Sequence, residues 1–243
     1  MDFLVDKLSL DVLPVVLDAN PRHETADDRD AAFRQAAETL TERDLLHHDT
    51  VDQNLTDWLR VVARPTWEIA LRWHVAGDVS RMCVSHTRDL SISVMRAGET
   101  FVVQECGADL FAPIVRALGT AQAAKFQNVN APTADLSAAF DDAMDGANLA
   151  DKLTRLGVPT ADAGPLGRAV YGCDTYAEIV GIAYGDGQYD PVGGPVTVFD
   201  TDFGRIVGTS SVSAHGVAWS SLSPGSPQRL RQALEALADR LEQ

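Results

Sequence analysis

The sequence predicts an α+β fold in which a central antiparallel β-sheet is flanked by helical bundles. Between residues 66 and 106, and again after residue 174, short β-rich segments follow one another. Helical, acid-rich stretches precede each β-rich region, and a helix follows it, so the order helix, four strands, helix occurs twice. We expect one domain over residues 1–243, with two pseudo-symmetric halves of about 1–125 and 126–243.

The first quarter of the chain is predicted to be mostly helical. The apolar residues of the segment Phe3 to Leu10 suggest a first strand, and Val12 to Leu17 a short helix. Apolar residues at helical spacing predict a helix that begins at Thr25 or Asp27 and reaches Leu46. Asp52 opens a second helix, which Pro65 ends.

The next strand has two chemically different faces. Trp67, Ile69, Leu71, Trp73 and Val75 alternate with polar or small residues and share one face, which the protein's own helices must cover. The other face carries Glu68, Ala70, Arg72 and His74, and it meets either solvent or a partner. Three further strands up to Cys106 complete a four-stranded meander, and residues 109–118 form a short helix.

The second half repeats this order. Helices are predicted over residues 133–156 and 162–171, and strands over residues 175–184, 192–200, 205–212 and 216–222. Ser226 is the expected N-cap of the last helix, and Pro227 takes its first position. The apolar stripe of that helix consists of Leu230, Leu234, Leu237 and Leu241.

Composition excludes several classes of partner. The formal net charge is −15 with only 20 basic residues, which argues against nucleic acid and against anionic membranes. No apolar run reaches the roughly 18 residues that a membrane-spanning helix needs. Three cysteines without CxxC spacing, and an acidic N-terminus without a signal peptide, favour a cytoplasmic location.

Catalytic motifs are weak. Asp200 and Asp202 form an Asp-x-Asp pair that would suit a divalent cation, but they flank a hairpin turn, where aspartates are favoured for their backbone hydrogen bonds. Arg205 is close enough in sequence to pair with either acid. No glycine-rich nucleotide loop and no Gly-x-Ser-x-Gly elbow occurs. We therefore expect neither enzymatic activity nor a cofactor, with a metal-dependent hydrolase or transferase using Asp200 and Asp202 as the less favoured alternative.

A series of segments resembles the EspG family, the cytosolic substrate chaperones of the type VII (ESX) secretion systems of actinobacteria. The segments that carry most of the resemblance are residues 175–180, residues 199–205, and Trp219 followed by residues 223–227 and a closing helix. Trp58, the Ala63-Arg64-Pro65 triplet and Trp67 stand in the order seen in that family. The resemblance implies a non-enzymatic chaperone or adaptor that binds the apolar tip of helical PE/PPE-type substrates and keeps them soluble before export.

The resemblance also implies a partner surface at the hairpin between the first long strands, which turns here through the short segment Ala76-Gly77-Asp78. The candidate partner-binding residues are Arg72, His74, Gly77, Asp78, Val79 and Arg81. The identity of the client stays open, as does an oligomeric structural adaptor with a different client. A homodimer formed through an exposed edge strand is a further alternative.

Overall fold

A large antiparallel sheet organises the molecule. A computed structural model describes residues 1–20, 23–185 and 188–242, which form a nine-stranded sheet in the order β6-β5-β4-β3-β8-β9-β10-β11-β7. The strands are β3 (Trp67–Val75), β4 (Asp78–His86), β5 (Ser91–Ala97), β6 (Thr100–Glu105), β7 (Val129–Pro132), β8 (Thr175–Gly185), β9 (Gln188–Thr201), β10 (Gly204–Val212) and β11 (Ala218–Pro224). The α+β prediction with a central antiparallel sheet is confirmed.

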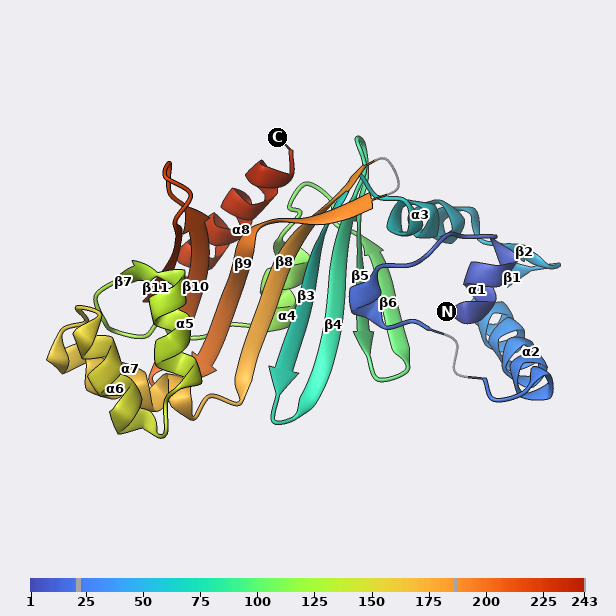
Figure 1. Ribbon diagram of the computed structural model, residues 1–243. Helices are drawn as coiled ribbons and strands as arrows, with labels where there is room; N and C mark the ends of the chain where they lie inside the picture. Colours follow the sequence, from blue (N-terminus) through green and yellow to red (C-terminus); the bar gives the residue numbers. More distant parts are fainter. Residues whose placement is uncertain (21–22, 186–187, 243) are drawn as a thin grey trace.

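The two predicted meanders meet at the middle of this sheet. Strand β3 pairs with β8 from Trp67 opposite Ala183 to Val75 opposite Thr175, so the first strand of each meander lies beside the other. From this seam the strands run outward in chain order on both sides, with β7 added beyond β11 (Figure 1). The repeated order of helix, four strands and helix is therefore visible in the sheet order, while the boundary near residues 125 and 126 stays a prediction.

Helices cluster at the two ends of the sheet. The N-terminal group comprises α1 (Asp2–Lys7), the 3₁₀ turn η1 (Val15–Leu17), α2 (Ala26–Glu42) and α3 (Gln53–Ala63), with a small hairpin of β1 (Leu46–His47) and β2 (Thr50–Val51). At the other end lie α5 (Thr133–Asp141), α6 (Gly146–Arg155) and α7 (Thr160–Tyr171) (Figure 1). Side-chain caps fix several starts, because Thr25 and Asp52 accept hydrogen bonds from the Asp28 and Leu55 amides.

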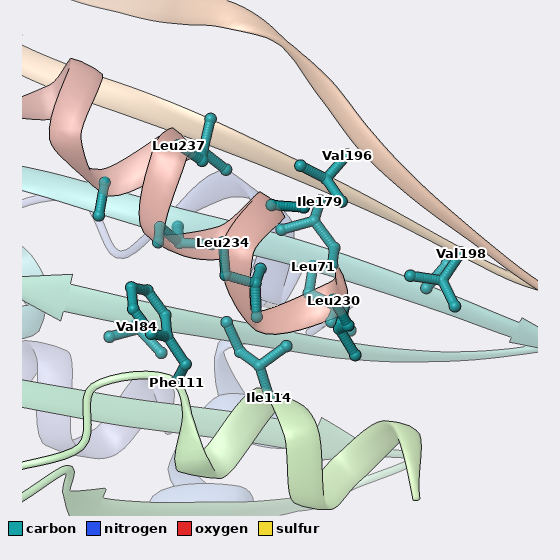
Figure 2. Packing of buried hydrophobic residues seen from close by; sticks show 14 of the residues in the cluster. Leu71, Val84, Phe111, Ile114, Ile179, Val196, Val198, Leu230, Leu234 and Leu237 are labelled. Atoms are coloured by element: carbon teal, nitrogen blue, oxygen red, sulfur yellow. The ribbon is translucent and has the colours of Figure 1, made fainter. Parts of the chain in front are cut away.

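One face of the sheet is covered by the helices that end the two halves, α4 (Ala112–Leu118) and α8 (Pro227–Leu241). Leu230, Leu234 and Leu237 of α8 and Ile114 of α4 pack on the apolar side chains of β3, β4, β8 and β9 (Figure 2). Ser226 caps α8 as predicted. We call this the covered face.

Gly181 permits the close approach of α8 to the sheet. A Cβ atom on it would lie 3.0 Å and 3.1 Å from methyl groups of Leu241 and Leu237. A side chain at this position would therefore push the end of α8 away from β8.

Two local predictions were wrong. Phe3 to Leu10 is not a strand: its first five residues belong to α1, because Leu4 and Leu8, one helical turn apart, pack in one cluster with Leu55 and Leu59 of α3. The helix after Thr25 ends at Glu42, and Leu46 instead pairs with Val51. The helical region predicted over residues 133–156 is confirmed, and it consists of two helices, since the side chain of Asp145 caps a new start by accepting from the Asn148 amide.

Candidate functional site

The opposite face of the central strands is only partly covered. Strand alternation places Glu68, Ala70, Arg72 and His74 of β3 on this face, as predicted, while Trp67, Ile69 and Leu71 enter the core beneath α4 and α8. At its ends the face is packed by η1 and α3 on one side and by α5 to α7 on the other. Between η1 and α5, none of the described helices lies over this face (Figure 1). We call it the open face.

A groove of about 1040 Å³ lies on the open face. Its floor is formed by β3 and β8, and its walls by residues 11–16 and by the end of α3 with the residues that follow it. The residues that line it include Asp11, Val12, Val15, Arg64, Glu68, Arg72, Glu178, Val180, Ile182 and Tyr184. Most of the lining is aliphatic, so the groove suits apolar side chains.

Residues 11–18, which we call the strap, form one wall of the groove. Arg96 of β5 holds its end by donating to the carbonyl oxygens of Leu17, at 2.9 Å, and of Asp18. Asp11 is held by an ion pair with Arg64. Val12 and Val15 nevertheless remain 81% and 68% exposed, although both line the groove. Two apolar side chains are thus presented to solvent at the rim of an apolar groove.

Among the described lining residues, Glu68 is the one buried acid of the groove. The residue lines the groove and is 1% exposed. Among the described residues, no group forms a hydrogen bond with its Oε2 atom. Burial raises the pKa of this carboxyl to about 7, although a hydrogen bond with the Tyr184 side chain lowers it in part.

Four of the predicted partner-binding residues lie together on the open face. Arg72 lines the groove, and the His74 ring stacks on Tyr176 of β8 with ring centroids 4.4 Å apart. On β4, Val79 and Arg81 stand directly opposite His74 and Arg72. Arg81 also lies 4.0 Å from the Asp18 carboxylate of the strap.

The other two predicted residues lie at the tip of the β3–β4 hairpin. Ala76 and Gly77 form the two-residue turn with φ of 48° and 95°, and Asp78 begins β4 opposite Val75. Positive φ at both positions is the requirement of the hairpin turn that matches strand twist. Gly77 and Asp78 are exposed and lie outside the groove, so the predicted set is split between the open face and this tip.

The part of the groove formed by β8 and the wall formed by the strap were not predicted from the sequence. Val180, Ile182 and Tyr184 face the groove because β8 pairs with β3, a contact between residues over 100 positions apart that local patterns do not reveal. One sequence signal was available, because both faces of β8 carry apolar residues. Val180 and Ile182 follow Glu178 on one face, and Ala177 and Ile179 lie on the other.

The Asp200 side chain has a structural role. Arg205 donates to both of its carboxylate oxygens, at 2.6 Å and 2.7 Å, and also to the carbonyl oxygens of Leu118 and Gly119 at the end of α4. The predicted pairing of Arg205 with one of the two acids is thus confirmed for Asp200. In the described part of the chain, no group of three or more His, Cys, Asp or Glu side chains is placed to hold a metal ion.

The three cysteines are free, and burial raises the pKa of the Cys83 thiol well above its ordinary value. A search of the described helices finds none that combines the length and the apolar character required to cross a membrane.

Relatives of this chain are known at low sequence identity. An ESX-3 secretion-associated protein, EspG3 of Mycolicibacterium smegmatis, is 29% identical over 241 residues, covering 96% of this chain and 82% of the relative. The protein of the same name from Mycobacterium tuberculosis is 23% identical over 256 residues, covering 97% of this chain and 86% of the relative.

A solved structure has the same fold. The Mycobacterium tuberculosis type VII secretion system chaperone EspG5, solved in complex with a PE25–PPE41 dimer, superposes with a TM-score of 0.80 at 17% identity. The match covers 98% of this chain and 92% of EspG5. The sequence model of the EspG family matches residues 1–236, and the chain therefore belongs to the EspG family.

Proposed function

We propose that this protein is a cytoplasmic, non-enzymatic chaperone or adaptor of a type VII (ESX) secretion system. Its client is a helical protein pair of the PE/PPE type, whose apolar tip it masks before export. Membership of the EspG family and the fold shared with EspG5, whose solved complex contains a PE–PPE dimer, support this assignment. The Asp200 carboxylate is already engaged by Arg205, which favours the non-enzymatic interpretation.

The observation that carries the proposal is the groove on the open face. A soluble chain with a net charge of −15 keeps an aliphatic groove of about 1040 Å³ uncovered, with two exposed valines at its rim. Burial of apolar side chains there would contribute about 25 cal/mol per Å² of surface removed from water. An apolar client tip is the kind of surface that gains most from such a groove.

The predicted hairpin residues extend this surface. Arg72, His74, Val79 and Arg81 continue the open face from the groove toward the β3–β4 turn. Polar and aromatic groups around an apolar centre are the usual composition of a protein interface. We assign the groove to the apolar contact and these four side chains to its rim.

An affinity purification from actinobacterial cells, with the bound chains identified by mass spectrometry, tests the proposal. Stoichiometric recovery of a PE–PPE pair, kept through gel filtration, is the expected result. Recovery of another protein, from cells shown to express PE–PPE pairs, would contradict it and favour an adaptor with a different client.

A self-associating adaptor is the remaining alternative. Strand β6 ends the described sheet, and Val102 on it is an exposed apolar residue. Elution of the purified chain as a homodimer that does not dissociate when the PE–PPE pair is added would favour this alternative.

A further inference from the structure

Glu68 is an unusual residue for the floor of an apolar groove. A buried carboxylate normally has hydrogen-bond partners on both oxygens, because an unsatisfied buried acceptor costs free energy. Here Oε2 has none among the described residues, and the residue lines the groove that we assign to the client. The Oε2 atom is itself buried, so the free chain retains an acceptor that a bound molecule can satisfy once the side chains covering it move aside.

The other charged groups of the groove are better balanced. Asp11 forms an ion pair with Arg64 at the rim, and Arg72 stands directly opposite Glu178 in the β3–β8 register. Glu68 stands opposite Ile182, which offers no charge. Among its described residues, the groove therefore has one negative group in excess, at its most buried point.

We propose that Glu68 receives a cationic side chain, lysine or arginine, that the client presents from within its apolar contact segment. The proposal rests on the proposed function, because it assigns the client to this groove. The cation would donate a hydrogen bond to Oε2, and the aliphatic stem of lysine or arginine would lie against Val180 and Ile182.

A cation fits this site better than the other classes of ligand group. An anion would be repelled by Glu68 and by the excess negative charge of the chain. A neutral amide would satisfy Oε2 but would leave the charge of the carboxylate uncompensated. A charged donor compensates it, and charge-assisted hydrogen bonds are roughly twice as strong as neutral ones.

The groups near Glu68 determine whether a pH effect in the groove can be attributed to this carboxyl. Tyr184 of β8 contacts it through a hydrogen bond, and Cys83 of β4 interacts with it electrostatically but stays protonated, since burial raises the pKa of that thiol. The Arg64 hydrogen bond lowers the pKa of Asp11, so Asp11 is ionised near neutral pH. Glu178 of β8 and Arg72 of β3 are the other charged side chains on the groove floor. Because the pKa of the Glu68 carboxyl is about 7, this group changes its protonation between pH 6 and pH 8.

A cation bound at Glu68 favours the ionised carboxylate and lowers its pKa below the value of about 7 in the free chain. Binding then releases a proton at pH 6 and none at pH 8. We expect the affinity for a cation to be about tenfold higher at pH 8 than at pH 6.

Hexylammonium serves as the probe, with 1-hexanol as its neutral match. The ammonium group stays charged at both pH values, because such amines titrate near the lysine pKa of about 10.4. Calorimetry on the full chain should show binding of hexylammonium with the tenfold pH dependence, and NMR of the Glu68 carboxyl carbon should show its pKa falling. Glu68→Gln should abolish both effects. Glu178→Gln, which removes a more exposed carboxylate of the same groove, should preserve them.

Equal binding of hexanol and hexylammonium, or unchanged binding to Glu68→Gln, would overturn the proposal. A thermal melt shows whether Glu68→Gln is folded. If that variant does not fold, the NMR titration of the wild-type carboxyl decides alone: a pKa that hexylammonium does not lower overturns the proposal.

Experiments with the PE–PPE pair recovered in the affinity purification test the proposed function and the cationic occupant of the groove separately. Displacement of hexylammonium by the pair, together with weaker binding of the pair to Glu68→Gln, would support the cationic occupant. Binding of the pair without displacement would overturn the occupant and leave the proposed function standing. Hexylammonium binding with no PE–PPE pair that binds would overturn the proposed function and, with it, the assigned occupant.

Discussion

The two faces of strands β3 and β8 come from the same stretches of chain, but one is covered by helices and the other is left open. On the covered face, Leu71 and Ile179 are fully enclosed by α4 and α8. On the open face, their neighbours Arg72, Glu178 and Val180 line a groove that no helix fills. The covered face accounts for the stability of the fold, and the open face retains apolar surface and a buried charge that the fold itself does not require.

This difference indicates where binding and stability can be separated by mutation. Substitutions on the covered face should unfold the protein without a specific effect on binding. Substitutions on the open face should change binding while the fold persists.

The largest effect is expected for Leu234→Ala on the covered face. Leu234 is fully buried in α8, and its truncation removes apolar contacts and leaves a cavity. The free energy of unfolding, measured by denaturant titration, should fall by about 2–5 kcal/mol. Val180→Ala, on the open face, is the matched control and should cost clearly less, because Val180 is only partly buried beside the groove. Equal losses would contradict the distinction between the faces.

The next effect concerns the pH dependence of stability. The pKa of Glu68 is raised from its ordinary value of 4.5 to about 7 in the folded chain, so the folded state binds more protons than the unfolded state between these values. Stability contributed by the protonated group is therefore present below pH 4.5 and is lost as the pH rises through 7. At about 1.4 kcal/mol per pKa unit, this loss amounts to about 3 kcal/mol by pH 8.

Glu68→Gln isolates that contribution, because it removes the titration and keeps the shape of the side chain. Denaturant titrations at pH 5 and pH 8 should show the wild type losing more stability than the variant by about this amount. Parallel pH profiles of wild type and variant would show that the buried carboxyl has no raised pKa.

The smallest effect is expected at the hairpin tip next to the open face. Ala76 has a φ of 48°, a left-handed conformation that asparagine adopts more readily than alanine. Ala76→Asn should raise the free energy of unfolding by about 0.5–1 kcal/mol. Ala97→Asn, at an exposed residue before the β5–β6 turn without positive φ, should give no gain. A gain in stability in both variants would show that asparagine itself, and not the turn conformation, causes the effect.

The sequence predicted those parts of the fold that depend on local patterns. The Ser226 cap and the leucine stripe determined α8, and strict alternation determined β3 together with the chemistry of its two faces. Strand β7 was missed, because its four residues form a strand only through pairing with β11. The first helix was predicted as a strand, since six residues cannot distinguish the two periods.

The candidate site could be predicted only in part, for the same reason. Arg72 and His74 follow from alternation in β3, but the groove requires the seam between β3 and β8 and the position of the strap. The raised pKa of Glu68 depends on its burial, which the sequence of β3 does not reveal, since Arg72 on the same face of that strand is exposed.

The most direct test of the central claim compares two valines of equal exposure. Val15 is 68% exposed at the groove rim, and Val212 is 67% exposed near the end of β10, outside the groove. Each is replaced by aspartate, and the affinity for the purified PE–PPE pair is measured by calorimetry. A charge at position 15 should weaken binding strongly, because it would be buried against the apolar client, whereas the same charge at position 212 should leave affinity unchanged. Unchanged affinity of Val15→Asp, in a variant that melts like the wild type, would contradict the assignment of the client to the open face.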